Sequence, residues 1–333
     1  MDSLEKKIDY AVEIFNTVYE GTIDREQMLY KHFSNPFKVK EPIQFYEENG
    51  VVAGMNAFMG TYFKENGNIH FLLQSCDTAV LSEFRGKGIF TKLINEREKN
   101  DSEAEFIFGL PNENSFPGFI KMGWKEIAKF TVLIKIINPG SFLLGSEKKI
   151  GRILDEIWNF IFSRIRLKED EYCQVNENIV FNAEEIECIN AEIENGFLRS
   201  NEFYRWKTNQ SSKKFKVIRL KSQESLAGLL IYHTKMLRGR KCVVIDDWFA
   251  KGDKEDKKRK IRNMMNFIKQ EGSLIEIPFV NVSSNDFWIW KKLNFCQIPF
   301  YKRASLVISP RGKEVGFLGT CSFKNIDTDT ILN

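Results

Sequence analysis

Two segments of this 333-residue chain, residues 106–127 and 275–298, follow the same pattern. Each begins with an apolar run typical of a strand and continues through an Asn- and Ser-rich turn into a short aromatic helix. Each then ends on a turn-forming residue followed by an aromatic one. The separation of the two segments is too long for a solenoid, whose repeats span about 20–50 residues. The pattern therefore predicts a duplicated domain, with two copies of one fold.

The first half of the chain alternates helical and strand periodicity in an order that defines the fold class. Helices are expected at 4–19, 25–33, 89–99 and 116–122, and strands at 43–46, 51–61, 69–81, 105–110 and 129–137. Asn-Gly pairs at 49–50 and 66–67 predict hairpin turns, because both residues tolerate positive φ. We expect an α+β fold in which each copy has a mixed, mostly antiparallel central sheet flanked by helices.

Domain boundaries follow from the repeat and from an amphipathic stretch at 148–166 that predicts a connecting helix. The first copy is expected at 1–145, the linker at 146–170, the second copy at 171–310 and a tail at 311–333.

Charge and cysteine usage exclude several classes of protein. The chain has 49 Lys and Arg against 45 Asp and Glu, and the net charge of +4 is spread along it, which argues against a nucleic-acid partner. The charged start MDSLEKK does not fit a secretory signal, and the apolar stretch 51–63 is too short to span a bilayer. Six scattered cysteines form neither a zinc motif nor a disulfide framework. We expect a cytoplasmic protein without a metal.

The tetrapeptide Arg85-Gly86-Lys87-Gly88 lies where a predicted strand meets a helix that begins near Ile89. Two glycines allow a tight turn whose N–H groups converge, and the helix N-terminus adds its dipole and its unsatisfied amides. The turn therefore predicts a cradle for a diphosphate. It matches neither a Walker A loop nor a Rossmann fingerprint, because the required Ser or Thr and the third glycine are missing. A charged surface turn that only caps the helix is the alternative.

Residues 75–93 resemble motif A of the GCN5-related N-acetyltransferase superfamily, Arg/Gln-x-x-Gly-x-Gly/Ala. The matching positions are Arg85, Gly86, Lys87, Gly88, Ile89 and Phe90, with Phe90 in place of the usual small residue. The family's next motif is matched by Asn112 to Ser115, Phe119 and Gly123-Trp124. The order of elements from residue 4 to residue 137 is also that of the family.

The resemblance implies an acyl-coenzyme A donor, acetyl or longer. The turn amides would hold the coenzyme diphosphate, and Thr78, Ala79 and Val80 would lie along the pantetheine and its thioester. Asn112 or Asn114 would contact the pantetheine or the phosphate side.

Phe119 occupies the position of the tyrosine that often protonates the departing thiolate in this family. Phenylalanine has no proton to give, so either another group serves or the thiolate departs without help.

A general base would assist attack by an amine, and Asp77 is the candidate, because it lies in an otherwise uncharged run at 71–82. Partial burial on a central strand is expected to raise its pKa. The alternative is that Asp77 caps a bulge or turn. The run Gln74 to Thr78 resembles a subgroup of bacterial two-domain N-acyltransferases that act on nucleotide-linked amino sugars, in which an acidic residue on this strand is thought to be the base.

Three neighbours of Asp77 are weaker candidates. His70 is a second possible base, with a surface or packing role as the alternative. Ser75 could orient an acceptor, although strand serines usually bond their neighbours. Cys76 could form an acyl intermediate, but a buried small thiol is the commoner explanation.

The second copy has the basic run 254–260 where the first has its glycine turn. Without glycine the cradle is not expected to form, and the run is interpreted as a solvated loop and helix start. We therefore expect only the first copy to bind coenzyme A and the second to form a wall of the acceptor site. Residues 203–206 and 246–248 could contribute aromatic and charged groups there, with a core role as the alternative.

The function expected from these features is coenzyme A-dependent N-acylation of a small primary amine, most readily that of a nucleotide-linked amino sugar for surface polysaccharide or glycan synthesis. The alternatives are an aminoglycoside, a protein amine or a cell-wall precursor as acceptor, or a non-catalytic sensor of acyl-coenzyme A. The assignment of the acceptor rests on the resemblance alone, because this fold serves many functions and does not by itself identify an acceptor.

Overall fold

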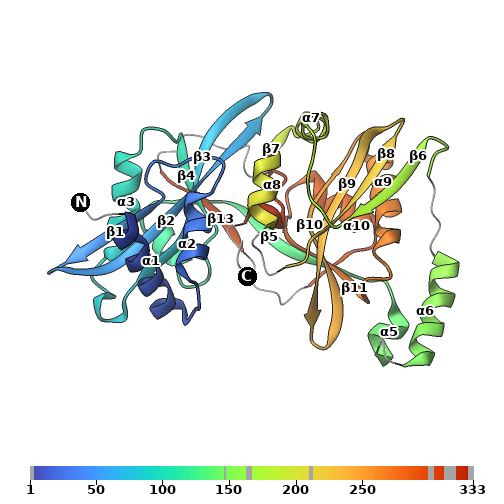
Figure 1. The fold of residues 1–333 in the computed structure, drawn as a ribbon, viewed down its shortest axis with the longest axis horizontal. Coiled ribbons are helices and arrows are strands. Elements are labelled where there is room, and N and C mark those ends of the chain that lie inside the picture. Colours follow the sequence, from blue (N-terminus) through green and yellow to red (C-terminus); the bar gives the residue numbers. More distant parts are fainter. Residues whose placement is uncertain are drawn as a thin grey trace.

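The computed structural model describes residues 4–145, 148–162, 167–209, 213–298, 304–310 and 320–328. They form two α+β units side by side, joined by a sheet that runs through both (Figure 1). None of the helices in this described part of the chain is long and apolar enough to cross a membrane.

The first unit contains the helices and strands expected from the sequence. They are α1 (Leu4–Tyr19), α2 (Arg25–Phe33), β1 (Ile43–Glu48), β2 (Val51–Glu65), β3 (Asn68–Val80), α3 (Ile89–Asn100), β4 (Phe106–Gly109), α4 (Phe116–Lys121) and β5 (Lys125–Ile136). The strand β2 is longer than predicted because the Asn66-Gly67 turn lets β2 and β3 pair up to Glu65 and Asn68.

The second unit repeats this order with β6 and β7 as additional strands, which confirms the predicted duplication. Its elements are β6 (Glu171–Asn176), α7 (Ala183–Ala191), β7 (Asn195–Phe197), α8 (Asn201–Thr208), β8 (Lys216–Ser222), β9 (Ser225–Leu237), β10 (Arg240–Ala250), α9 (Lys254–Phe267), β11 (Leu274–Asn281), α10 (Asn285–Lys292), β12 (Cys296–Gln297) and β13 (Ser305–Ile308). Helices α9 and α10 follow β10 and β11 as α3 and α4 follow β3 and β4.

The basic run at 254–260 is helical throughout, so its interpretation as partly a solvated loop was wrong. It forms the first half of α9, and Asp253 caps that helix by accepting from the N–H groups of Glu255 and Asp256. Arg259 and Lys260 are paired with Asp256 at 2.8 and 2.9 Å. Neutralisation by such i,i+3 and i,i+4 partners lets consecutive basic residues remain in a helix.

The two units exchange strands. The order along the sheet is β1-β2-β3-β4-β13-β5-β11-β10-β9-β8-β6, so β13, from the end of the second unit, lies between β4 and β5. The other end of β5 pairs with β11 of the second unit. The predicted second domain, 171–310, therefore includes a strand that completes the sheet of the first. In the predicted tail, residues 311–319 and 329–333 lie outside the described residues.

Two short helices connect the units, α5 (Pro139–Leu144) and α6 (Lys149–Phe162). They form a hairpin at the edge of the second unit (Figure 1). The predicted connecting helix, 148–166, corresponds to α6, and its last residues, 163–166, lie outside the described part.

Helices cover both faces of the first unit's sheet, and the alternation of β2 sorts its side chains between them. Ala57 and Met59 pack with α1 and α2, whereas Phe58 packs with the side chains of α3 and α4. The cluster under α1 and α2 continues into the second unit, where α8 contacts α2: the indole N–H of Trp206 donates to the carbonyl of Tyr30 at 3.1 Å. The second unit thus lies against the helix that faces the candidate site.

Candidate active site

Strands β3 and β4 run parallel and then separate. Their ladder starts at Leu72 opposite Phe106 and ends at Ser75 opposite Gly109. Beyond that point, among the strand pairings of the described residues, residues 76–80 pair only with β2. One edge of this stretch therefore faces an opening between the strands, and backbone groups along such an edge can bind an extended ligand.

A bulge lies in this opening. Ala57 is opposite Cys76 and Met55 is opposite Ala79, so Asn56 faces two residues of β3, Asp77 and Thr78. Asp77 has a φ of +46°, a left-handed conformation that is rare for residues other than glycine. Asp77 does lie in a bulge, as the sequence alternative proposed, but its carboxylate pairs with Lys31 and His32 side chains. A bulge re-aims a side chain, and strained residues of this kind concentrate at functional sites.

The Asp77 carboxylate points toward α2, where it contacts two basic side chains. Its Oδ2 atom lies 2.6 Å from Nζ of Lys31 and 2.9 Å from Nε2 of His32. Burial by itself would raise the pKa of Asp77, but the charges and hydrogen bonds of Lys31 and His32 outweigh it and hold that pKa well below its usual range. The predicted rise in pKa was therefore wrong: Asp77 is a firmly ionised carboxylate.

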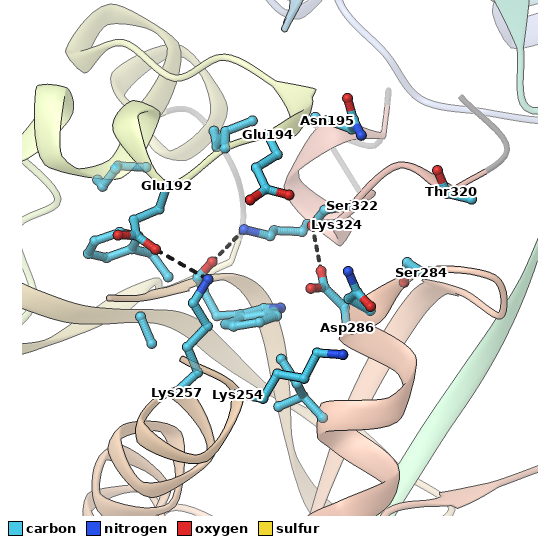
Figure 2. A pocket seen from close by; sticks show the side chains of 18 of the residues that line it. Glu192, Glu194, Asn195, Lys254, Lys257, Ser284, Asp286, Thr320, Ser322 and Lys324 are labelled. Carbon is cyan, nitrogen blue, oxygen red and sulfur yellow. Dashed lines mark hydrogen bonds and ion pairs between the residues drawn. The ribbon is translucent and has the colours of Figure 1, made fainter. Parts of the chain in front are cut away.

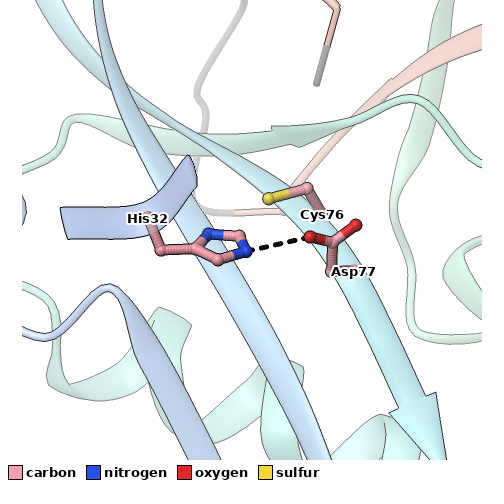
Figure 3. A group of neighbouring side chains, drawn as sticks. All are labelled: His32, Cys76 and Asp77. Atoms are coloured by element: carbon pink, nitrogen blue, oxygen red, sulfur yellow. Dashed lines mark hydrogen bonds and ion pairs between the residues drawn. The ribbon is translucent and has the colours of Figure 1, made fainter. Parts of the chain in front are cut away.

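His32, Cys76 and Asp77 form a compact group in which potential donor atoms lie within 4.8 Å of one another (Figure 3). Such a set could in principle ligate a metal ion. Here the Lys31 ammonium lies 2.6 Å from the same carboxylate oxygen, and a second cation at that place would be repelled. The group fits a buried ion-pair cluster better than a metal centre. The Cys76 thiol is buried and donates to the carbonyl of Ala57 at 3.5 Å.

The turn after β3 has the shape expected of an anion cradle. Gly86 and Gly88 have φ values of +81° and +75°, and a Cβ atom at either would meet nothing within 4 Å. Gly88 is the N-cap of α3 and provides no side-chain hydrogen bond to the helix. The first amides of α3 therefore have no side-chain cap from Gly88, and the space above the turn is open, which suits a diphosphate.

Basic side chains flank this turn. Nε of Arg85 donates to the carbonyl of Val80 at 3.2 Å, which ties the turn to the end of β3. Lys87 is about half exposed and lies 3.3 Å from Glu48, close enough to the surface to exchange this partner for a phosphate. The Thr78 carbonyl accepts from the hydroxyl of Tyr19 at 2.6 Å, so a pantetheine arm would have to bond other backbone groups of the strand.

Phe90 and Phe119 pack against each other between α3 and α4. Their ring centroids are 5.1 Å apart, and Phe119 is in turn 4.5 Å from Trp124. Phe119 is buried, and its ring end lies near Gly109 at the end of β4. The residue at the usual tyrosine position therefore packs the core between α3 and α4.

Asn112 orders the loop before α4. Its Oδ1 atom accepts from the N–H groups of Asn114 and Ser115, at 3.0 Å each. This Asx arrangement explains the presence of Asn112 by turn chemistry. Both residues are exposed, but the Oδ1 atom of Asn112 is engaged within the turn.

Two predicted residues have other partners. The Ser75 hydroxyl accepts from the side-chain amide of Asn56 at 3.1 Å, which favours the packing alternative. His70 lies at the opposite end of β3, where Nδ1 is 2.8 Å from Glu105. At about 3.3 Å per residue, seven positions separate His70 from Asp77 by roughly 23 Å, so the structure places it away from the site.

Lys31, His32 and Asn56 were missed from the sequence. Asn56 is completely buried beside the bulge, and its amide also donates to the hydroxyl of Thr78. The available signal was composition: His32 is one of only three histidines in the chain, and it directly follows Lys31 in a short helix that must pack on a sheet. Spacing could not reveal their partner, because 45 residues separate His32 from Asp77.

The corresponding opening of the second unit is partly occupied by the chain itself. Strands β10 and β11 also stop pairing early, after Val244 and Glu276, but residues 320–328 pack against both strands, and Asn281 of β11 donates to the carbonyl of Cys321 at 3.0 Å. Lys324 lies 3.2 Å from Asp247 of β10. The N-terminus of α9 is capped by Asp253, whose carboxylate takes the place that an anion would occupy. These contacts favour a donor site in the first unit.

A cavity of about 580 Å³ lies in the second unit, between the N-termini of α9 and α10 (Figure 2). Its charged lining is balanced, with the basic residues Arg199, Lys254, Lys257 and Lys324 and the acidic residues Glu192, Glu194, Asp253 and Asp286. Several of these are already paired, such as Lys257 with Glu192 at 3.2 Å. This balance gives the cavity no preference for a diphosphate.

The aromatic and acidic residues singled out in the second unit belong to its interior. Phe203, Tyr204 and Trp206 are buried, which confirms the core alternative for them. Asp247 is buried beside Arg199, with Nε 2.9 Å from Oδ2, and accepts from the hydroxyl of Tyr204 at 3.0 Å. Burial would raise the pKa of Asp247, but Arg199 and Lys324 lower it to about 2.

No family model and no curated protein sequence matches the chain. Several solved structures, however, align with the chain. A GCN5-related N-acetyltransferase from Anabaena variabilis aligns with a TM-score of 0.68 at 11% identity, over 93% of this chain and 71% of that one. A probable N-acyltransferase from Enterococcus faecalis aligns at 0.61 and 11%, over 91% and 70%. Saccharomyces cerevisiae N-myristoyltransferase with bound myristoyl-coenzyme A aligns at 0.52 and 8%, over 96% and 86%. These likenesses show the tandem acyltransferase fold.

Proposed function

We propose that this chain is an acyl-coenzyme A-dependent N-acyltransferase that acylates a small-molecule primary amine. One observation carries the proposal: in the first unit an opening between β3 and β4 leads directly to the Gly86–Gly88 turn and the N-terminus of α3. An extended ligand with a diphosphate at one end fits that arrangement. In the second unit residues 320–328 pack beside the corresponding strands and Asp253 caps α9, although a cavity lined by Ser322 and Lys324 remains there.

The donor would lie along β3. Its diphosphate would accept from the backbone N–H groups of the turn and of the first residues of α3, with Lys87 and Arg85 adding positive charge. Its pantetheine would follow the edge of residues 78–80, which brings the thioester to the bulge at Asp77. Coenzyme A supplies an activated acyl group, and the residues of the chain position it.

In the proposed reaction the amine nitrogen attacks the thioester carbonyl, a C–N bond forms, the C–S bond breaks and the coenzyme leaves as thiolate. The proton lost by the amine goes to Asp77. Because Lys31 and His32 keep the pKa of Asp77 low, this carboxylate is a weaker base than one matched to neutral pH. Alignment of amine and thioester therefore supplies more of the rate than proton transfer does.

The acceptor that we propose is the amino group of a nucleotide-linked amino sugar, used for a surface polysaccharide or glycan. Support for this class comes from the run Gln74 to Thr78 alone. The second unit contacts α2 beside this site, where the hydroxyl of Tyr30 donates to the carbonyl of Trp206 at 2.9 Å. In that arrangement the second unit forms a wall of the acceptor site.

Thiol release from acetyl- and longer acyl-coenzyme A tests the proposal, with nucleotide-linked amino sugars, aminoglycosides, peptide amines and cell-wall precursors as acceptors. We expect turnover with the first class. Turnover with another class of amine would support the proposed acyltransferase activity and contradict only the proposed acceptor. Coenzyme A binding without turnover of any amine would contradict the proposed enzymatic activity. It would favour a role as a non-catalytic sensor of acyl-coenzyme A.

A further inference from the structure

Helix α6 exposes its apolar side chains to solvent. Phe160 is 90% exposed and Ile150 66%, and Ile153, Leu154 and Ile157 are each exposed by more than two fifths. At 100° per residue these side chains cover one continuous side of the helix. The hydrophobic clusters formed by the described residues include no side chain of α6. We call this side the α6 apolar face.

The opposite side of α6 attaches the helix to the protein through small and polar groups. Gly151 packs against Gly140 of α5 so closely that a Cβ on Gly140 would lie 2.2 Å from the carbonyl of Gly151. The buried carboxylate of Asp155 accepts from the N–H groups of Gly140 and Ser141 at 2.7 and 2.9 Å. These contacts fix the rotation of the helix, so the apolar face is held outward.

Further apolar side chains extend this face beyond α6. Leu143, at the end of α5, is 73% exposed. Nε of Arg240 donates to the carbonyl of Phe142 at 2.7 Å and so joins the β9–β10 hairpin to α5. On that hairpin Met236 is 67% exposed. Patches of this kind on soluble proteins mark interaction sites.

The charges near the α6 apolar face are mostly basic. Lys148, Lys149 and Arg152 are exposed at the start of the helix. Arg240, Lys241 and Lys269 lie in a groove on the attached side of α6, together with the buried Asp155. Glu156 is the exposed acidic residue of α6, and in the groove Lys241 lies 3.7 Å from Glu271. An apolar face with a basic rim complements a surface that is apolar inside and anionic outside.

We propose that the α6 apolar face binds the surface of a membrane containing anionic lipid. The helix has 14 residues, fewer than the roughly 20 that a membrane-spanning helix needs, so it would lie in the interface with its apolar side chains among the acyl chains. The basic rim would contact the headgroups. A second copy of this chain fits less well, because pairing two such faces brings two basic rims together.

Flotation of the purified chain with vesicles tests the proposal. Vesicles of phosphatidylcholine mixed with an equal amount of phosphatidylglycerol should carry roughly tenfold more protein than vesicles of phosphatidylcholine alone. The double variant Ile153→Glu, Ile157→Glu should lose this binding, and Lys149→Glu with Arg152→Glu should reduce it. The matched control is Ile69→Glu at the start of β3, where the isoleucine is 59% exposed. It should bind as the unchanged chain does.

Three outcomes would overturn the proposal: no binding to either vesicle, binding that is the same for both, or binding that survives the double variant. Light scattering without vesicles tests the competing occupant. A dimer that the double variant dissociates, together with no flotation, would assign the face to a second copy. Circular dichroism of each variant confirms that loss of binding is not loss of folding.

Discussion

The Nε2 atom of His32 lies 2.9 Å from the Oδ2 atom of Asp77, although the two residues belong to a helix and a strand 45 positions apart. The contact forms where β3 bulges and has separated from β4. It turns an isolated carboxylate into a member of a buried charged cluster. Much of what can be tested about this site follows from that cluster.

Replacing Asp77 by Asn should lower turnover about 10- to 100-fold while coenzyme A affinity stays within about twofold. The reduction lies at the low end for acid–base catalysis, because a carboxylate with a low pKa is a weak base. Steady-state kinetics with the acceptor found by thiol release gives kcat, and calorimetry with coenzyme A gives the affinity. An unchanged kcat would remove Asp77 from the role of base.

The Asp77→Asn variant should also change how the stability of the folded protein depends on pH. The folded-state pKa of Asp77 lies below its value of about 4 in unfolded chains, so its contribution is complete above that pH and is lost as pH falls through the folded pKa. Asp77→Asn should cost about 3 kcal/mol near neutral pH, because it leaves Lys31 and His32 without their anion. Urea unfolding should show this difference shrinking below about pH 4. A difference that is constant in pH would contradict it.

Gly88→Val should weaken coenzyme A binding at least tenfold. The φ of +75° disfavours any side chain by roughly 1–2 kcal/mol, and a branched one would also fill the open side of the turn. Gly239→Val is the matched control, since Gly239 has a φ of +73° and equally open surroundings in the β9–β10 hairpin. Calorimetry should show weaker coenzyme A binding for Gly88→Val only. Equal affinities of the two variants would contradict the assignment of this turn as the diphosphate cradle.

Phe119→Tyr restores the side chain that the family usually has here, yet we expect no gain in turnover. The ring is buried between Phe90 and Trp124, so an added hydroxyl would cost about 1–3 kcal/mol unless it found a partner. Phe116→Tyr, on the less buried start of α4, should be nearly neutral. Thermal unfolding and thiol release measure the two effects. A faster Phe119→Tyr enzyme would show that the ring reaches the leaving thiolate.

Features that depend on a few consecutive residues were predictable from the sequence. The helix 25–33 matches α2, which Asp24 and Gln27 cap reciprocally. Gly86 and Gly88 adopt the positive φ values that their turn requires, and Asn66 and Gly67 form the predicted hairpin. The duplicated order of elements was visible because each copy repeats its own local pattern.

Features that depend on assembly were not predictable. The sign of the Asp77 pKa shift was wrong, because burial was foreseen and the two basic partners on α2 were not. The partner of Arg259 was also hidden, because Glu171 comes from the distant strand β6. The Asp253 cap of the helix at 254–260, by contrast, was a local signal that the sequence interpretation missed. The second unit's opening is narrowed by residues 320–328, which return to it from the end of the chain.

By itself, then, the sequence determined the elements, their duplication and the glycine turn, because these arise from backbone preferences and apolar periodicity within short windows. Only the tertiary structure decided that β13 crosses into the first unit, that His32 and Lys31 hold Asp77 ionised, and that α6 faces outward. Each of these depends on contacts between residues far apart in the chain. Local preferences do not select among the possible long-range partners, whereas packing of the whole sheet does.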